Sequence, residues 1–148
     1  MLKGIHPLLG PDLLHALRTM GHGDDIVIAD ANFPAHAMGP RVIRADGVDA
    51  TSMTEAVLTH MPLDTFVPDA AWRMQVVGDP SAVPPVCAEF QEIVSRLTGD
   101  FVVRSVERFA FYEMARNAAC IVATTELRLY GNIIFKKGVV LPNEVFGA

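Results

Sequence analysis

Short runs of almost purely apolar residues, separated by segments with helical spacing, constrain the fold of this chain more than any other feature. Such runs occupy residues 26–29, 121–123 and 133–135. A strand with one face in water alternates apolar and polar residues, so runs without polar residues indicate strands that are buried on both faces. We therefore predict an α/β fold, as a three-layer α/β/α arrangement with a largely parallel or mixed central sheet. The whole chain, residues 1–148, is expected to form a single domain.

Caps and breakers set the remaining expected boundaries. Gly21 can take the positive φ that ends a helix. Ser52 and Glu55 have the spacing of a capping box, and Pro62 stops the helix that they begin. The expected helices cover 11–20, 52–61, 86–97 and 109–118, and further strands cover 41–44, 72–77 and 101–103. Residues 31–40 are expected to form a long ordered loop.

The composition bears on partners and location. Hydrophobic residues make up 51% of the chain and the formal net charge is -5. An acidic chain with scattered basic residues lacks the positive field that binds nucleic acid or anionic lipid, so neither is an expected partner. The apolar excess favours surface buried between subunits. No run approaches the roughly 20 apolar residues of a membrane span, and a secretion signal is not apparent at the start, so the expected location is cytoplasmic. Cys87 and Cys120 lie in apolar stretches and are expected to be reduced core residues.

His22 and Asp30 are the first candidates for chemistry. His22 lies between two glycines, which leave its imidazole accessible as a general acid or base, although a histidine in a turn also serves as a hydrogen-bonding residue. Asp30 ends an apolar run and precedes a loop with glycine and proline. Its carboxylate can accept hydrogen bonds from ligand hydroxyls at the carboxyl end of a strand, or can cap the following turn.

Two later segments add polar groups. Arg108 begins the run Arg-Phe-Ala-Phe-Tyr-Glu, in which the aromatic residues fit a helix core while the guanidinium can bind ligand hydroxyls or an acidic neighbour. Tyr130, Gly131 and Asn132 place a phenol, a flexible backbone and an amide in succession. That sequence suits recognition of a hydroxylated ring and equally suits a turn into the last strand.

Metal and cofactor chemistry have weak support. His22, Asp24, Asp30 and His36 form a loose set of possible metal ligands, but their spacing matches no established signature. The third glycine of a dinucleotide-binding fingerprint is missing, and there is no phosphate-binding loop and no nucleophile elbow. We therefore expect neither a metal nor another cofactor.

Four motifs, taken in order, resemble the L-fucose mutarotase family: Met-Gly-His-Gly-Asp at 20–24, Ala-Asp-Ala-Asn-Phe-Pro-Ala-His at 29–36, Arg-Phe-Ala-Phe-Tyr-Glu at 108–113 and Tyr-Gly-Asn at 130–132. The related D-ribose pyranase family shares the Gly-His and Ala-Asp elements. The resemblance implies that His22 is the proton donor and that Asp30, Arg108 and Tyr130–Asn132 bind substrate. It also implies a compact α/β fold in a ring-like homo-oligomer.

The implied reaction interconverts the α and β anomers of a free monosaccharide by acid-base ring opening and closure. His22 would protonate the ring oxygen, and the base could be Asp30, Tyr130 or water. The alternatives are pyranose/furanose interconversion of D-ribose, a non-catalytic monosaccharide-binding module, and a small metal-dependent hydrolase or isomerase.

Overall fold

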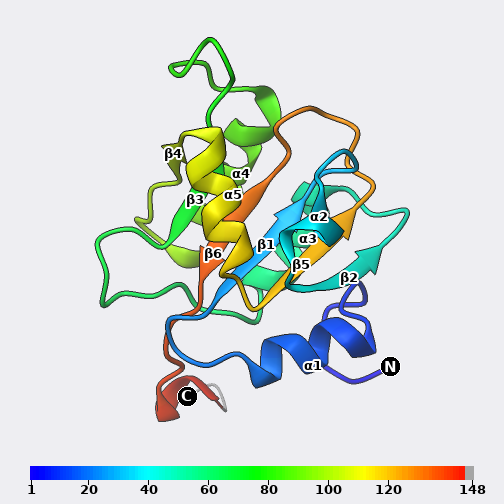
Figure 1. Cartoon of the computed structure of the whole chain (residues 1–148). Coiled ribbons are helices and arrows are strands. Elements are labelled where there is room, and N and C mark those ends of the chain that lie inside the picture. The colour runs from blue at the N-terminus through cyan, green and yellow to red at the C-terminus, as the bar shows by residue number, and fades with distance from the viewer. Residues whose placement is uncertain (146–148) are drawn as a thin grey trace.

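Residues 1–145 are described by the structure, a computed structural model, and they form one six-stranded sheet with helices on both faces (Figure 1). The strands are β1 (Asp25–Ala29), β2 (Arg41–Ala45), β3 (Ala71–Met74), β4 (Arg104–Val106), β5 (Cys120–Thr124) and β6 (Ile133–Lys136). The helices are α1 (Pro11–Thr19), α2 (Ala35–Met38), α3 (Ala50–Leu58), α4 (Pro85–Thr98), α5 (Arg108–Arg116) and α6 (Pro142–Val145).

The sheet is mixed, as the apolar runs predict. Its strand order is β2-β5-β1-β6-β3-β4. Strands β2, β5 and β1 are parallel to one another, as are β3 and β4, whereas β6 is antiparallel to both of its neighbours. The start of β6 therefore lies at the same edge as the carboxyl ends of β1 and β3. At that edge lie Asp30, which follows β1, and Asn132, which precedes β6.

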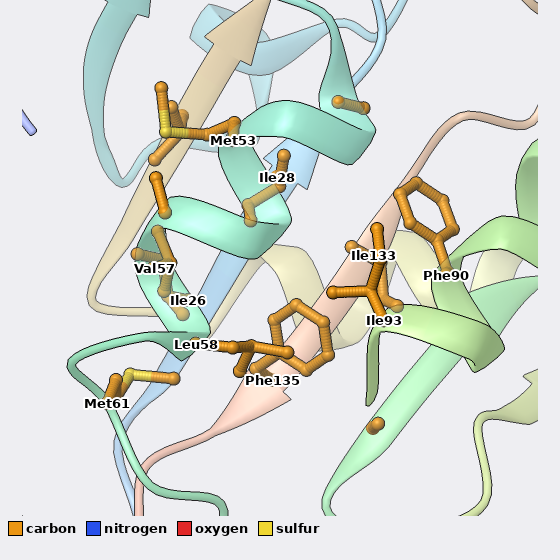
Figure 2. Packing of buried hydrophobic residues seen from close by; sticks show 14 of the residues in the cluster. Ile26, Ile28, Met53, Val57, Leu58, Met61, Phe90, Ile93, Ile133 and Phe135 are labelled. Atoms are coloured by element: carbon orange, nitrogen blue, oxygen red, sulfur yellow. The ribbon is translucent and has the colours of Figure 1, made fainter. Parts of the chain in front are cut away.

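Two apolar clusters, one on each face of the sheet, confirm the three-layer α/β/α arrangement. Figure 2 shows the first cluster, where α3 and α4 lie side by side and residues such as Met53 and Phe90 pack on Ile26 and Phe135. The second cluster includes Phe111 of α5, which packs against the opposite face. Successive residues of β1 alternate between the two clusters, which explains why this run carries no polar residue.

Several local predictions are wrong in detail. Gly21 does not take a positive φ; that conformation falls on Gly23. Helix α3 begins at Ala50 because the Asp49 carboxylate, rather than the Ser52 side chain, caps it by accepting the Ser52 N–H at 2.7 Å. The expected loop 31–40 contains the short helix α2.

The fourth strand lies three residues later than predicted. The segment 101–103 is apolar, but the Gln91 side chain satisfies its backbone instead of a neighbouring strand. Gln91 Nε2 donates to the Phe101 carbonyl at 3.0 Å, and Gln91 Oε1 accepts from the Val103 N–H at 2.8 Å. Pairing with β3 starts only at Arg104, and β3 itself ends at Met74, short of the predicted residue 77.

Two other expectations concern cysteines and membranes. Cys87 and Cys120 are free and buried, as predicted. Burial raises the pKa of the Cys120 thiol to about 11. Across residues 1–145, the structure has no helix with the length and apolar character needed to span a membrane.

Candidate active site

A pocket at the carboxyl edge of the sheet brings together most of the candidate residues. Its volume is about 190 Å³, and it is lined by Asp30, Asn32, Phe33, Pro34, Met74, Val77, Arg108, Tyr112, Leu129, Tyr130 and Asn132. A larger hollow of about 450 Å³ near the N-terminus is lined mainly by apolar side chains, and none of its lining residues within 1–145 carries a carboxylate. The smaller pocket is therefore the candidate active site, because it brings together a carboxylate, a guanidinium, a phenol and an amide.

Asp30 and Asn132 form a reciprocal pair at the base of the pocket. Asn132 Nδ2 donates to Asp30 Oδ2 at 2.8 Å, and Asn132 Oδ1 accepts the Asp30 backbone N–H at 2.8 Å. The Asn32 N–H donates to the other carboxylate oxygen at 2.9 Å. Burial raises the pKa of Asp30 above its ordinary value of 3.8, although these hydrogen bonds oppose the rise. The carboxylate is thus fixed in orientation and is more basic than an exposed aspartate.

Arg108 has a side-chain donor, Nε, that finds no hydrogen-bond acceptor among residues 1–145. It is the first residue of α5, directly after the end of β4, and its side chain lines the pocket. The guanidinium lies over the Phe109 ring, with Cζ 4.7 Å from the ring centroid. Its Nε is buried and makes no hydrogen bond within the described chain. A buried donor without a partner is costly, so a ligand oxygen in the pocket would satisfy it.

Tyr130 holds its phenol at the pocket through an unusual backbone conformation. Its φ is 65°, the one positive value at a non-glycine residue of the described chain. The Val77 N–H donates to the phenol oxygen at 3.0 Å, which leaves the phenol proton free to donate elsewhere. The next residue, Gly131, has no room for a side chain. A Cβ there would stand 2.6 Å from Glu126 Cγ and 3.5 Å from Asp30 Cβ. Strain of this kind concentrates at functional sites.

His22 lies away from this pocket. It precedes β1 whereas Asp30 follows it, and five strand residues at ~3.3 Å each separate the two by roughly 16 Å. His22 Nε2 lies 2.9 Å from Asp64 Oδ1, and its ring packs on Phe66 with centroids 5.3 Å apart. The His22 side chain is 47% exposed. The chain alone does not bring the predicted proton donor to the predicted binding residues.

Asp64 is a partner of His22 that the sequence reasoning missed. It lies 42 residues away along the chain, and its local sequence carries no signal for the contact. Burial alone would raise the pKa of Asp64, but hydrogen bonds from the Phe66 N–H and from His22 outweigh it, so the pKa lies below 3.8. The ionised carboxylate accepts a hydrogen bond from Nε2–H, which fixes the ring and leaves Nδ1 to exchange a proton.

The loose set of metal ligands does not converge, since His22 and Asp30 lie at opposite ends of β1. Throughout residues 1–145, the structure gathers no group of three His, Cys, Asp or Glu side chains suited to hold a metal ion.

The apolar residues that line the pocket were not predicted from the sequence. Met74 and Val77 come from the end of β3 and the turn after it, whereas Leu129 precedes β6, and the meeting of these two segments depends on the sheet order.

A carboxylate, an amide, a guanidinium and a phenol around a small pocket define a protein that binds a hydroxylated small molecule. Comparison with known proteins gives the family. Residues 3–140 match the RbsD / FucU transport protein family, and the chain belongs to this family. The chain is 46% identical to a fucose mutarotase of Bos taurus over 151 residues, which cover 98% of each chain.

Solved structures agree with this assignment. The crystal structure of the fucose mutarotase in complex with L-fucose from Streptococcus pneumoniae is 40% identical, covers 95% of this chain and 100% of that one, and has a TM-score of 0.89. Bacillus subtilis RbsD complexed with D-ribose shares the fold with a TM-score of 0.74, at 21% identity over 95% of this chain and 100% of that chain.

Proposed function

We propose that this protein is an L-fucose mutarotase, which interconverts the α and β anomers of the free sugar. The observation that carries the proposal is the pocket lining itself, where Arg108, whose buried Nε has no hydrogen-bond partner among residues 1–145, and the oriented carboxylate of Asp30 border a space of about 190 Å³. A monosaccharide presents hydroxyls that can both accept and donate hydrogen bonds. The 46% identity to a fucose mutarotase over nearly the full chain supports fucose as the sugar.

Mutarotation needs one acid and one base. The anomeric hydroxyl loses its proton as the ring oxygen gains one, and the C1–ring oxygen bond breaks to give the open-chain aldehyde. Rotation about C1–C2 presents the other carbonyl face, and reversal of the proton transfers closes the ring as the second anomer. No electrons are exchanged with a redox partner. A positioned acid and base are typically worth about 10² to 10⁴ in rate.

We assign the base to Asp30. Its pKa is raised by burial, so the carboxylate takes up a proton more readily than an exposed aspartate does. The Tyr130 phenol oxygen already accepts the Val77 N–H, so it suits the role of a hydrogen-bond donor to the sugar. Arg108 and Asn132 complete the binding of hydroxyls in this proposal.

The acid is His22, and we propose that it acts in the pocket of a second copy of the chain. His22 and the exposed Phe66 lie at one edge of the sheet, whereas the pocket and the exposed Val77 and Leu129 lie at the other. Apolar side chains at both edges suit burial between subunits. A contact that joins two different surfaces repeats from subunit to subunit, and it forms a ring when the rotation between neighbouring subunits closes. The ring-like homo-oligomer implied by the resemblance has this form.

NMR saturation transfer between the α and β anomeric protons of L-fucose tests the proposal. Wild-type protein is expected to accelerate exchange, and His22→Ala to slow it by about 10²-fold or more. The fold should persist, since the His22 side chain is half-exposed. The L-fucose dissociation constant of the variant separates lost binding from lost proton transfer. Wild-type exchange in the His22→Ala protein would remove the histidine from the mechanism.

Two other outcomes would favour the alternatives. Faster pyranose/furanose exchange of D-ribose than anomer exchange of L-fucose would indicate a ribose pyranase. L-fucose binding without any acceleration of exchange would indicate a monosaccharide-binding module, recognised by ligand-induced stabilisation alone.

For the location we propose the cytoplasm. The two free, buried cysteines, Cys87 and Cys120, agree with a reducing compartment.

A further inference from the structure

An ion pair between the buried Glu126 and the half-exposed Arg128 lies behind the pocket wall. Glu126 is 3% exposed and lies in the loop between β5 and β6, within the segment that ends at Asn132. Its carboxylate faces Arg128, with Oε1 2.9 Å from the Arg128 Nε and Oε2 2.9 Å from Nη2. The same Oε1 accepts the Arg128 backbone N–H at 2.9 Å. This fork-to-fork geometry fixes both orientation and distance.

Glu126 is also tied to the rest of the fold on three sides. Its Oε2 accepts the N–H of Ala50 at the start of α3, at 3.3 Å. Its backbone N–H donates to Thr124 Oγ1, and its carbonyl accepts the N–H of Ala31, the residue after Asp30, at 2.9 Å. Glu126 therefore joins the loop before β6 to the residue that follows β1.

The contact with Gly131 transmits this position to the pocket. A Cβ at Gly131 would stand 2.6 Å from Glu126 Cγ, so the glycine backbone lies directly on the Glu126 side chain. Tyr130 and Asn132 flank this glycine, and both line the pocket. Tyr130 has a positive φ that a non-glycine residue adopts only when its surroundings impose it. The Glu126 side chain is the part of those surroundings that lies closest to Gly131.

The charge of Glu126 is maintained in the folded protein. Hydrogen bonds from the Arg128 side chain, which outweigh burial, hold the pKa of Glu126 below its ordinary value of 4.5. An ionised carboxylate accepts hydrogen bonds at both oxygens, whereas the amide of a glutamine would place two donors against the Arg128 guanidinium or the Ala50 N–H. Glutamine at residue 126 would therefore not reproduce the hydrogen bonds that glutamate makes there.

We propose that Glu126 is a positioning residue for sugar binding, which sets the Tyr130–Asn132 segment through its contact with Gly131 and its ion pair with Arg128. The proposal rests on the function proposed above. Glu126 does not line the pocket, so it acts through its neighbours and does not touch the sugar.

The test compares Glu126→Gln with Glu89→Gln. Glu89 Oε1 also accepts from Arg128, at 2.8 Å, but its side chain is 44% exposed and belongs to α4. Each change removes one negative charge beside the same arginine and leaves one amide oxygen that can accept from it, and only the first alters the side chain whose Cγ lies on Gly131. KM and kcat for L-fucose anomer exchange are measured for both, with the L-fucose dissociation constant and the thermal midpoint of each protein.

Glu126→Gln is expected to raise KM and the dissociation constant about tenfold, the loss expected for one misplaced hydrogen bond. Its kcat per folded site should stay within about threefold of wild type, because the Glu126 charge is the smallest of the causes that shift the pKa of Asp30, whose burial and Asn32 hydrogen bond remain. Glu89→Gln should leave KM within about twofold. A purely structural role would instead reduce the folded fraction, and with it the apparent kcat, at constant KM. An unchanged KM in Glu126→Gln, or equal rises in both variants, would overturn the proposal.

Should Glu126→Gln fail to fold, Arg128→Lys carries the test. Lysine keeps the cation but lacks the fork that fixes Glu126, so a smaller rise in KM is expected. A KM within twofold of wild type would contradict the positioning role. Absence of exchange in the wild-type protein would count against the proposed function, and the dissociation constants would still report on Glu126.

Discussion

Asp30 shows how one residue serves both fold and chemistry. One backbone donor, the Asn32 N–H, and one side-chain donor, Asn132 Nδ2, fix its carboxylate. The Asn132 Oδ1 in turn accepts the Asp30 N–H. Burial raises the pKa of the carboxyl group, and the nearby charge of Glu126 adds to the rise. In the proposed site the carboxylate is the form of Asp30 that binds the sugar, so binding would depend on ionisation of a group whose pKa is raised above its ordinary value.

The pH dependence of binding follows from the direction of that shift. The affinity for L-fucose should be full above the Asp30 pKa and should fall as the pH decreases through it, with a midpoint above 3.8. Titration calorimetry on the His22→Ala variant measures this without the titration of the histidine. Asp30→Asn, which carries no proton to lose, should bind weakly at every pH. A midpoint at or below 3.8 would contradict a raised pKa.

At the scale of elements, β1 and β6 organise both ends of the molecule. The two strands are antiparallel, so Asp30 and Asn132 meet at one edge while Asp25 and Lys136 meet at the other. Just beyond β6, Gly138 approaches the segment that carries Asp64. A Cβ at Gly138 would overlap the Leu63 carbonyl oxygen and would stand 3.0 Å from Asp64 Cα. Both edges thus depend on the register of the same pair of strands.

Gly138→Ala should therefore disturb the His22–Asp64 pair from a distance. The added methyl group must displace backbone, which typically costs about 1–3 kcal/mol of unfolding free energy. Anomer exchange should fall because Asp64 moves, while L-fucose binding in the pocket should persist. Urea denaturation and saturation transfer measure the two effects. Gly10→Ala is the control, since its Cβ meets nothing within 4 Å. Equal stability of the two variants would refute the argument.

Element prediction from sequence succeeds where burial alone decides. Runs such as 26–29 and 133–135 are apolar because helices cover both faces of the sheet, and they are found where predicted. It fails where a distant side chain decides. Gln91 satisfies the backbone of 101–103 and delays β4, and the Asp49 carboxylate takes the capping role that the spacing assigns to Ser52.

At the scale of the whole molecule, part of the site follows from the sequence. Asp30 and Asn132 were expected beside strand ends, and an α/β sheet gathers such residues at one edge. The position of His22 did not follow from the sequence, because eight residues along the chain become a full strand length in space. Neither the Asp64 contact nor the Glu126 support has a local pattern, since each depends on residues brought together by the sheet order.

Mixing two inactive variants tests the shared site. His22→Ala keeps an intact pocket, and Asp30→Asn keeps an intact histidine edge. If a site combines one edge from each of two subunits, refolding the variants together should restore activity to about a quarter of the sites, the fraction expected for random pairing. Each variant refolded alone serves as the control, and light scattering confirms that mixed oligomers form. Activity no greater than the sum of the separate variants would place both groups within one chain.

Strand β1 is five residues long, and it separates His22 from Asp30 of the same chain. In the proposed arrangement each chain carries one half of two different sites, so a dissociated chain has no complete site. Turnover per chain would then fall on dilution below the dissociation constant of the assembly, and early catalysis after refolding would grow with the square of the protein concentration.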